Sequence, residues 1–216
     1  MRQRNIKNLD EKIKQNDFGL IDDPRALRGK WRDEFADVHA EGRLSLCLEI
    51  GCGKGRFIAA RAEAFPHKGF IAVEGQSNVA LRALEKTQQS RFSNLRIFID
   101  YVTDIGEYFA PGELDGIYLN FSDPWPKARH AKRRLTYRER LLSYKSVLSP
   151  EGSIEFKTDN DGLFEFTLQE IEAAGLTVTE MTEDLAASGF ESRLFRTEYE
   201  ERFIASGKNI NYVKFR

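Results

Sequence analysis

The stretch Leu44-Ser45-Leu46-Cys47-Leu48-Glu49-Ile50, followed by Gly51-Cys52-Gly53-Lys54-Gly55, decides the fold that we predict for this chain. A short, mostly apolar run of this kind indicates a buried strand, and the segment 56–64 after the glycines favours a helix. Glycines between a strand and a helix let the backbone turn sharply and approach a ligand closely. This unit is typical of a parallel α/β sheet that binds its ligand at the carboxyl ends of the strands.

The rest of the chain repeats the alternation of apolar runs and helix-length segments. Further strands are predicted at 69–74, 95–99, 117–120, 154–157, 177–181 and 210–215. Further helices are predicted at 78–88, 137–148 and 163–174, and the last of these stops at Gly175, a common helix terminator. We therefore predict an α/β protein with a doubly wound, mostly parallel, seven-stranded Rossmann-like sheet and helices on both faces.

Length and composition place the chain among ordinary globular proteins. Its 216 residues favour one domain, 41% of them are hydrophobic, and the formal net charge is −1. Residues 1–43 are polar and basic and are predicted to form an N-terminal arm, solvated or loosely helical, ahead of a domain at 44–216. Without a membrane-length apolar run or a secretory signal, and with two cysteines that lack disulfide or zinc spacing, the sequence favours the cytoplasm.

Acidic residues stand at the predicted ends of three successive strands. They are Glu49, Glu74 and Asp100, and three carboxylates in such places are costly to bury without partners. Glu74 suits the hydroxyls of a ribose, and Asp100 suits an adenine amino group. The glycine spacing is Gly-x-Gly-x-Gly, and Glu49 can meet an ammonium, so S-adenosylmethionine is favoured over a dinucleotide, with Gly51 and Gly53 among its contacts. A glycine loop alone can also be a plain turn.

The second informative motif is Asn120-Phe121-Ser122-Asp123-Pro124-Trp125-Pro126-Lys127, which follows a predicted strand. Two prolines remove backbone donors and indicate a rigid loop. An amide, a carboxylate, an indole and an ammonium on such a loop can hold a flat polar heterocycle. The basic residues at 129–140 suggest that this heterocycle belongs to a nucleic acid, through local segregation of charge in a nearly neutral chain.

Each residue of this motif also has a structural interpretation. Asp123 can cap the turn at Pro124, which is an ordinary role for Asp before proline. Trp125 can stack on an extruded base or anchor the loop to the core, and the sequence leaves both open. The basic run can be a solvated helix start. Its attachment to the proline loop favours RNA contact.

Together these segments resemble the bacterial tRNA (guanine-N7)-methyltransferase family. The resemblance rests on the loop at 120–127 and the following Arg129-His130-Ala131-Lys132-Arg133-Arg134-Leu135-Thr136. It also rests on Phe156-Lys157-Thr158-Asp159-Asn160 and Thr197-Glu198-Tyr199-Glu200-Glu201. It covers roughly residues 25 to 205. It implies a class I methyltransferase fold and transfer of a methyl group from S-adenosylmethionine to N7 of guanosine 46 in the tRNA variable loop.

The resemblance also assigns roles to single residues. Glu49, Glu74, Asp100 and Asp123 are implied to line the S-adenosylmethionine site, with Asp123 as the catalytic carboxylate. The segment after Asp100 is one residue longer than the family pattern, so that match can fall on a neighbour. The implied guanosine contacts are Lys127, Asp159, Thr197, Glu198, Tyr199 and Glu200. The implied RNA contacts are Arg129, His130, Lys132, Arg133 and Arg134. No metal and no obligatory protein partner are implied, and the chain is expected as a monomer or homodimer.

Three other functions compete with this one. The first is a methyltransferase acting on a protein glutamine or a small amine, because Asn-x-x-Asp-Pro is similar to the acceptor loops of amino methyltransferases. The second is a non-catalytic RNA-binding protein that keeps the glycine loop as scaffold. The third, a dinucleotide oxidoreductase, is disfavoured by the glycine spacing.

Overall fold

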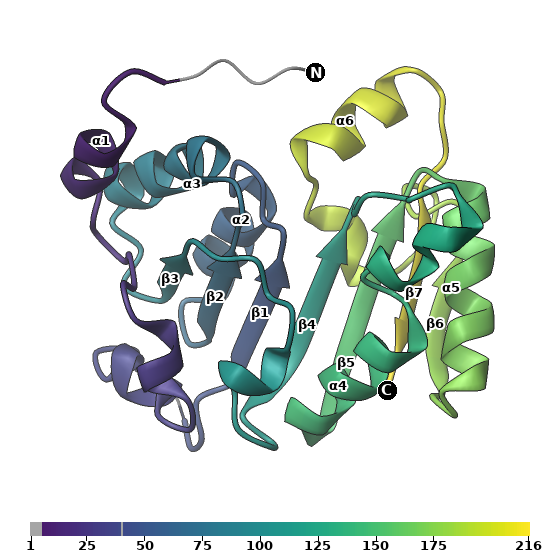
Figure 1. The fold of residues 1–216 in the computed structure, drawn as a ribbon, viewed down its shortest axis with the longest axis horizontal. Helices are drawn as coiled ribbons and strands as arrows, with labels where there is room; N and C mark the ends of the chain where they lie inside the picture. The colour runs from purple at the N-terminus through teal and green to yellow at the C-terminus, as the bar shows by residue number, and fades with distance from the viewer. Residues whose placement is uncertain (1–5, 40) are drawn as a thin grey trace.

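The computed structural model describes residues 6–39 and 41–216, which form one seven-stranded sheet between helices (Figure 1). The strand order is β3-β2-β1-β4-β5-β7-β6. β7 runs antiparallel to both β5 and β6, and the other neighbouring pairs are parallel. The order reverses direction next to β1, which is where a doubly wound sheet opens a crevice for ligands. The predicted fold class is confirmed.

All of the predicted strands and helices are present, with small differences at their ends. The strands are β1 (Leu46–Ile50), β2 (Gly69–Val73), β3 (Leu95–Phe98), β4 (Leu114–Asn120), β5 (Leu148–Thr158), β6 (Val178–Thr182) and β7 (Asn211–Phe215). The α-helices are α1 (Leu9–Gln15), α2 (Arg56–Ala64), α3 (Ser77–Ser90), α4 (Arg138–Val147), α5 (Asp161–Ala173) and α6 (Glu198–Ala205). Short 3-10 helices lie at η1 (Pro24–Leu27), η2 (Trp31–Phe35), η3 (Ile105–Glu107), η4 (Ala128–Arg133) and η5 (Glu191–Leu194). α1 and α6 were not predicted from the sequence.

Alternate side chains of the central strands pack into two separate hydrophobic cores. Leu48 of β1 and Ile71 of β2 belong to the larger cluster, which also contains residues of η2, α4 and α5. Cys47 and Phe70 point to the opposite face, into a cluster built with α2 and α3. Both faces of the parallel strands are therefore covered, which explains their continuous apolar runs.

The segment at 24–35 is part of this core rather than an arm. Trp31 is fully buried and donates through Nε1 to the carbonyl of Tyr108 at 2.8 Å. Phe35 is also buried, and Arg28 donates to the carbonyl of Gly106. The expectation of a solvated or loosely packed arm is therefore wrong for this stretch, because its two large aromatic residues cover one face of the sheet. The boundary at residue 43 stays a prediction, and residues 1–5 and 40 lie outside the described residues.

α6 lies above the carboxyl ends of β1 and β4 (Figure 1). It begins with a capping box in which Thr197 Oγ1 accepts from the backbone N–H of Glu200 at 3.0 Å. In the described part of the chain, no helix has the length and apolar character needed to cross a membrane.

Candidate active site at the carboxyl edge of the sheet

The predicted carboxylates of β1 and β2 meet at one edge of the sheet. Glu49 is the penultimate residue of β1, and Glu74 directly follows β2. The two strands pair in parallel, so their carboxyl ends lie side by side. Asn120, the last residue of β4, joins them, because β4 pairs with β1 on its other side.

Glu49 is a buried carboxylate with one free oxygen. The side chain is 1% exposed, and Asn120 Nδ2 donates to Oε1 at 2.8 Å. Oε2 has no hydrogen-bond partner among residues 6–39 and 41–216. Burial raises the pKa of Glu49 to about 8, and the hydrogen bond from Asn120 opposes that shift. A buried acceptor left open in this way is suited to a cationic donor from a ligand.

The glycine loop binds Glu74 and leaves an open surface. The backbone N–H of Gly53 donates to Glu74 Oε2 at 2.9 Å, and that of Gln76 donates to Oε1 at 3.0 Å. Gly51 and Gly53 have φ values of 77° and 58°. A Cβ atom at either position would meet no described atom within 4 Å. The loop therefore fixes the carboxylate and leaves room for a ligand against its backbone.

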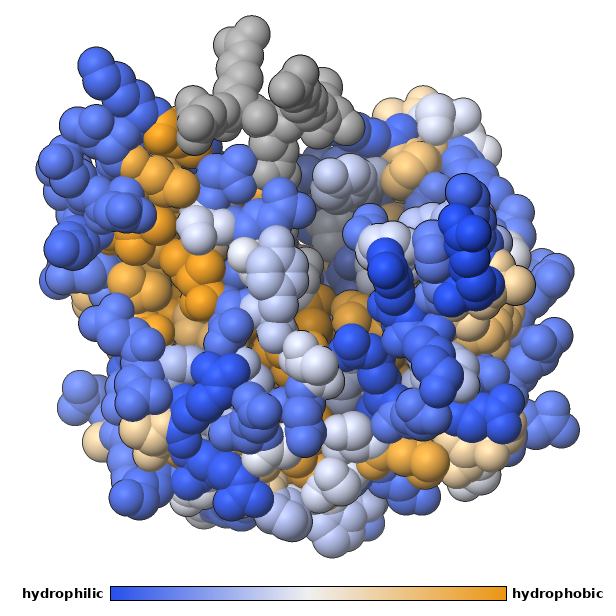
Figure 2. Space-filling model, viewed as in Figure 1, coloured by the Kyte–Doolittle hydropathy of each residue, from blue (hydrophilic) through white to orange (hydrophobic). Residues whose placement is uncertain are grey.

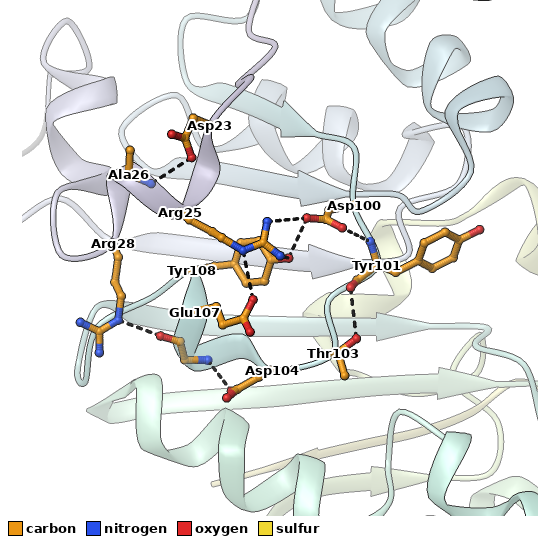
Figure 3. Close-up of polar contacts among 11 residues, drawn as sticks. Asp23, Arg25, Ala26, Arg28, Asp100, Tyr101, Thr103, Asp104, Glu107 and Tyr108 are labelled. Atoms are coloured by element: carbon orange, nitrogen blue, oxygen red, sulfur yellow. Dashed lines mark hydrogen bonds and ion pairs between the residues drawn. The ribbon is translucent and has the colours of Figure 1, made fainter.

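Asp100 is placed differently from the sequence expectation. β3 ends at Phe98, and Asp100 lies beyond it, where Oδ2 accepts from Arg25 Nη1 and from the Tyr108 hydroxyl, both at 2.8 Å (Figure 3). Oδ1 accepts from the backbone N–H of Tyr101 at 2.8 Å. Burial alone would raise the pKa of Asp100, but the hydrogen bonds from Tyr108 and Arg25 outweigh it and lower the pKa. In the described part of the chain Oδ1 has this one donor only, and the side chain is 32% exposed, so the carboxylate can still accept a hydrogen bond from a ligand.

The loop after β4 holds Asp123 between two strained residues. Phe121 and Trp125 have φ values of 51° and 41°, in the left-handed region that non-glycine residues seldom adopt. The Phe121 ring stacks on Phe203 of α6 at a centroid distance of 6.1 Å. Asp123 itself is exposed. Strain of this kind persists where the surrounding contacts fix the backbone, and it is common at functional sites.

Residues of η4, and Arg134 directly after it, contact this loop and hold it in place. Arg134 donates through Nε to the carbonyl of Pro124 at 3.0 Å and through Nη2 to that of Trp125 at 3.1 Å. The Arg133 guanidinium lies 4.8 Å from the centroid of the Trp125 ring, and His130 meets the same ring edge-on. These contacts support anchorage of Trp125 over free exposure for stacking. Two of the predicted RNA contacts, Arg133 and Arg134, therefore already have partners within the protein.

The segment Thr197–Glu200 divides into buried and accessible residues. Thr197 and Glu200 are 8% and 1% exposed and close the capping box of α6. Glu198 is half-buried, and its Oε1 accepts from Lys86 Nζ at 2.8 Å. Tyr199 is 60% exposed. Glu198 and Tyr199 are thus accessible from solvent, whereas Thr197 and Glu200 form the capping box that begins the helix.

A buried lysine ties this segment to the sheet. Lys157 of β5 is 0% exposed and donates to the carbonyls of Ser192 and Phe195, both at 2.7 Å. Its Nζ also lies 3.4 Å from Glu200 Oε2. Burial lowers the pKa of Lys157 and raises that of Glu200, since each charge is disfavoured away from water. Lys157 therefore fixes the start of α6 relative to β5.

Two ion pairs join α6 to the glycine loop and its neighbours. Lys86 of α3 donates both to Glu198 and to the carbonyl of Lys54, each at 2.8 Å. Arg56, the first residue of α2, forms a two-pronged pair with Glu201. The helix that carries the predicted substrate residues is thus fixed over the loop that carries the predicted cofactor residues.

The structure brings most, but not all, of the predicted residues to one edge. Glu49, Gly51, Gly53 and Glu74 form one cluster, and Asp123, Lys127 and Asp159 follow strands β4 and β5 beside it. Asp100 follows β3 at the same edge and is bonded to Arg25 and Tyr108. The ion pairs of Lys86, Arg56 and Arg25 were not predicted, because the partner of each is far away along the chain. In residues 6–39 and 41–216, no group of three or more potential ligands could hold a metal ion.

Comparison with known proteins identifies the family. Residues 43–213 match a family model described as "Putative methyltransferase". A tRNA (guanine-N(7)-)-methyltransferase from Exiguobacterium sp. is 42% identical over 210 residues, which is 97% of this chain and 95% of that protein. The chain belongs to the tRNA (guanine-N7)-methyltransferase family. Proteins with the same name from Brevibacillus brevis and Lachnoclostridium phytofermentans are 42% and 43% identical and cover 99% and 100% of this chain, and 97% and 99% of their own length.

Solved structures agree with the class I methyltransferase fold. A 16S rRNA methyltransferase aligns with a TM-score of 0.62 at 12% identity, over 86% of this chain and 91% of its own. A SAM dependent methyltransferase from Aquifex aeolicus aligns with a TM-score of 0.55 at 15% identity, over 97% and 98%. At these identities the likeness concerns the fold alone. The family resemblance and the fold class predicted from the sequence are both confirmed.

Proposed function

We propose that this protein transfers a methyl group from S-adenosylmethionine to N7 of guanosine 46 in the variable loop of tRNA. The observation that carries the proposal is family membership, with relatives of that name matching 97% or more of the chain. The site adds support, because the open oxygen of Glu49 and the carboxylate of Glu74 lie at the edge of the sheet from which the loop at 120–127 and its basic segment also leave. We also propose a monomer or homodimer that works in the cytoplasm.

The residues at the edge of the sheet fit S-adenosylmethionine. The open oxygen of Glu49 suits the ammonium of the methionine part, and Glu74, already oriented by Gly53, suits the ribose hydroxyls. The bare surface at Gly51 and Gly53 lets the ligand approach the backbone. When bound, S-adenosylmethionine supplies the methyl group on a sulfonium. Asp100, oriented by Arg25 and Tyr108, keeps an acceptor position on Oδ1 and stays a proposed contact of the adenine amino group.

In this methyl transfer the protein mainly has to position guanine N7 and the methyl group. Guanine N7 carries a free lone pair at neutral pH, so no general base is required, and the acceptor must be held in line. The purine gains positive charge as it is methylated. Asp123, exposed on a loop held by strained flanking residues, offers a fixed carboxylate to stabilise that charge. Lys127 and Asp159, which follow β4 and β5, are proposed to recognise the acceptor and donor groups of the guanine.

The RNA backbone is proposed to lie across η4 and its surroundings. Strongly hydrophilic side chains lie at the right of the face in Figure 2, over the region of η4, and a second group lies at its lower left. Lys132 is 73% exposed in its side chain and makes a loose 3.7 Å pair with Glu139. Arg129 and Lys127 are also exposed. Exposed cations next to the loop at 120–127 suit phosphate contacts.

The decisive experiment uses unmodified tRNA and tritiated S-adenosylmethionine with the purified protein. The expected product is 7-methylguanosine in the nucleoside digest, and mass mapping of the fragments should place it at position 46. A tRNA with adenosine at position 46 is the matched control and should accept no label. Label in that control would refute the site assignment, and label in another nucleoside would refute N7 methylation.

The same assay separates the competing functions. A methyltransferase for protein glutamine or small amines would leave bare tRNA unlabelled. A non-catalytic RNA-binding protein would bind tRNA and show no affinity for S-adenosylmethionine. The open carboxylate of Glu49 argues against that alternative, because a mere scaffold gains nothing from a buried, half-satisfied acid.

Cofactor binding near pH 7 is expected to release about one proton per site. Glu49 has a pKa of about 8 and is mostly protonated at that pH, whereas pairing with an ammonium lowers the pKa and ionises it. Near pH 9, where the free carboxyl is already ionised, the release should vanish. Calorimetry with S-adenosylhomocysteine in buffers of different ionisation enthalpy measures it. Glu49→Gln is the control and should release none, and a wild-type titration without proton release would contradict this role.

Replacing Arg129 and Lys132 with Ala should weaken tRNA binding and flatten its salt dependence. The slope of log K against log salt is expected to fall by about one for each lost phosphate contact. Binding of S-adenosylhomocysteine should not change. Lys145→Ala, an exposed cation near the end of α4, is the matched control. An unchanged slope in the double variant would show that these cations face solvent alone.

A further inference from the structure

Arg133 is an exposed cation whose hydrogen-bond donors are unused. The nearby cations Lys132 and Arg138 each pair with a glutamate. In the described part of the chain Arg133 has no carboxylate partner, and its side chain forms no hydrogen bond. Its guanidinium carbon lies 4.8 Å from the centroid of the Trp125 ring. A guanidinium carries five N–H donors in a flat fork, and contact with the face of a ring leaves them available for a ligand.

The Trp125 ring is held in place through its backbone and through its edge. Arg134 donates to the carbonyl of Trp125 at 3.1 Å and to that of Pro124 at 3.0 Å. His130 meets the half-buried indole edge-on, with the ring centroids 5.6 Å apart and an angle of 86° between the rings. The φ value of Trp125 is 41°, a conformation that persists only where the surrounding contacts fix it. The indole is therefore a fixed surface against which Arg133 lies.

The two adjacent arginines thus differ in what they can offer a ligand. The donors of Arg134 serve carbonyls of the loop, whereas those of Arg133 face no protein acceptor. A long exposed side chain loses conformational freedom when it binds, and a contact that restricts it beforehand lowers that cost. Phosphate oxygens match the fork of a guanidinium, which can donate two parallel hydrogen bonds to them. Arg133 over the indole therefore has the character of a preorganised phosphate site.

The place of this site in the fold indicates which phosphate it would bind. Trp125 stands two residues after Asp123 in the same loop. This step rests on the proposed function, in which a guanosine of tRNA is methylated beside Asp123. A phosphate at Arg133 would then belong to that nucleotide or to one of its direct neighbours. Such a contact fixes the register of the RNA backbone and reads no base.

We infer that Trp125 is a positioning residue whose ring holds the Arg133 guanidinium in place to bind an RNA phosphate beside the acceptor guanosine. The ring then acts on the substrate through Arg133 and does not stack on the extruded base. Two consequences distinguish this role. Trp125 contributes to tRNA affinity only while Arg133 is present, and it contributes little to the methyl-transfer step itself.

A double-mutant cycle on tRNA affinity tests this inference. Arg133→Ala should weaken tRNA binding by roughly 10-fold, the scale of one charge-assisted contact. Trp125→Leu should weaken it by roughly 3- to 10-fold, because the guanidinium loses its support. In the Arg133→Ala background, Trp125→Leu should cost less than about twofold, since the two residues act as one unit. Unchanged affinity in Trp125→Leu, or full additivity of the two losses, would overturn the inference.

Additivity also reveals a general loosening of the loop. Such a defect does not need Arg133 and would persist in the Arg133→Ala background. Trp125→Phe is the matched control and should bind tRNA within about threefold of wild type, because it keeps an aromatic face. A loss in Trp125→Phe as large as that in Trp125→Leu would contradict the role of the ring face. Binding of S-adenosylhomocysteine should be the same in all of these variants.

The single-turnover rate separates this role from stacking on the base. At saturating tRNA and S-adenosylmethionine, Trp125→Leu should react within about threefold of wild type, so the defect appears in KM for tRNA and not in kcat. A rate more than about tenfold lower, with tRNA affinity kept, would show that the indole contacts the guanine and would overturn the inference. A wild-type protein that forms no 7-methylguanosine in tRNA would refute the proposed function and this inference with it. An active wild type with additive variants would refute the positioning role alone.

Discussion

Replacing Asp123 with Asn is expected to lower the single-turnover rate of methyl transfer by roughly 10²–10³-fold. Asn has nearly the same shape and keeps an acceptor oxygen, but it lacks the charge that matches the positive purine being formed. The loop should stay in place, because Arg134 holds it through the carbonyls of Pro124 and Trp125 and not through the Asp123 side chain. Rapid quenching at saturating tRNA and S-adenosylmethionine measures the rate.

A second variant and two control measurements accompany this experiment. Lys127→Ala should mainly weaken guanosine binding and leave the rate at saturation nearly intact, because its charge does not complement the forming cation. Thermal melting and tRNA affinity of Asp123→Asn should stay close to wild type, since the side chain is exposed. A near-normal single-turnover rate in Asp123→Asn would refute charge stabilisation and leave Asp123 as the residue that caps the turn at Pro124.

The strained backbone around Asp123 shows why this loop depends on distant contacts. Phe121 and Trp125 both adopt positive φ, and each such residue costs on the order of 1–3 kcal/mol. That cost is offset by the stacking of Phe121 on Phe203 and by the bonds from Arg134. The loop at 120–127 is thus held between α6 and η4, and these contacts add to the rigidity expected from its two prolines.

The sheet could be predicted from the sequence because its signals are local. The runs around Leu48, Ile71 and Ile117 are continuous and apolar, as expected for strands buried on both faces. The glycine loop follows the first strand and precedes a helix, so its place at the edge of the sheet follows from the order of elements. Glu49 and Glu74 could be placed together for the same reason, since parallel strands bring their carboxyl ends to one edge.

The remaining features depend on contacts between residues far apart in the sequence. Trp31 and Phe35 lie in a polar stretch, and nothing local shows that they cover the sheet. Asp100 was expected to contact the cofactor, which stays a prediction, and its pairing with Arg25, distant along the chain, was not predicted. Glu200 was expected to contact substrate, which stays a prediction, and its burial beside Lys157 at the start of α6 was not predicted. A single sequence does not reveal such pairings, because each residue alone is an ordinary charged side chain.

The second large effect is expected at Lys157, and it concerns stability. Lys157→Met keeps the length of the side chain but removes the charge and the donors that serve Ser192, Phe195 and Glu200. A buried carboxylate and two carbonyls would then lack their partner, which costs about 3–5 kcal/mol. For a chain of this size the melting temperature should fall by roughly 6–20 °C. Urea titration of purified wild type and variant measures the change in free energy of unfolding.

The double variant Lys157→Met with Glu200→Gln decides whether the unpaired charge is the cause. Gln keeps an acceptor for the backbone N–H of Thr197 and carries no charge, so part of the lost stability should return. Glu200→Gln alone should cost less than Lys157→Met, because Lys157 retains its two carbonyl acceptors. If Lys157→Met unfolds at the same urea concentration as wild type, the buried pair contributes nothing to stability. The double variant could instead be less stable than Lys157→Met by the whole loss measured for Glu200→Gln alone. The two side chains would then act independently, and the start of α6 would be held by its capping box rather than by β5.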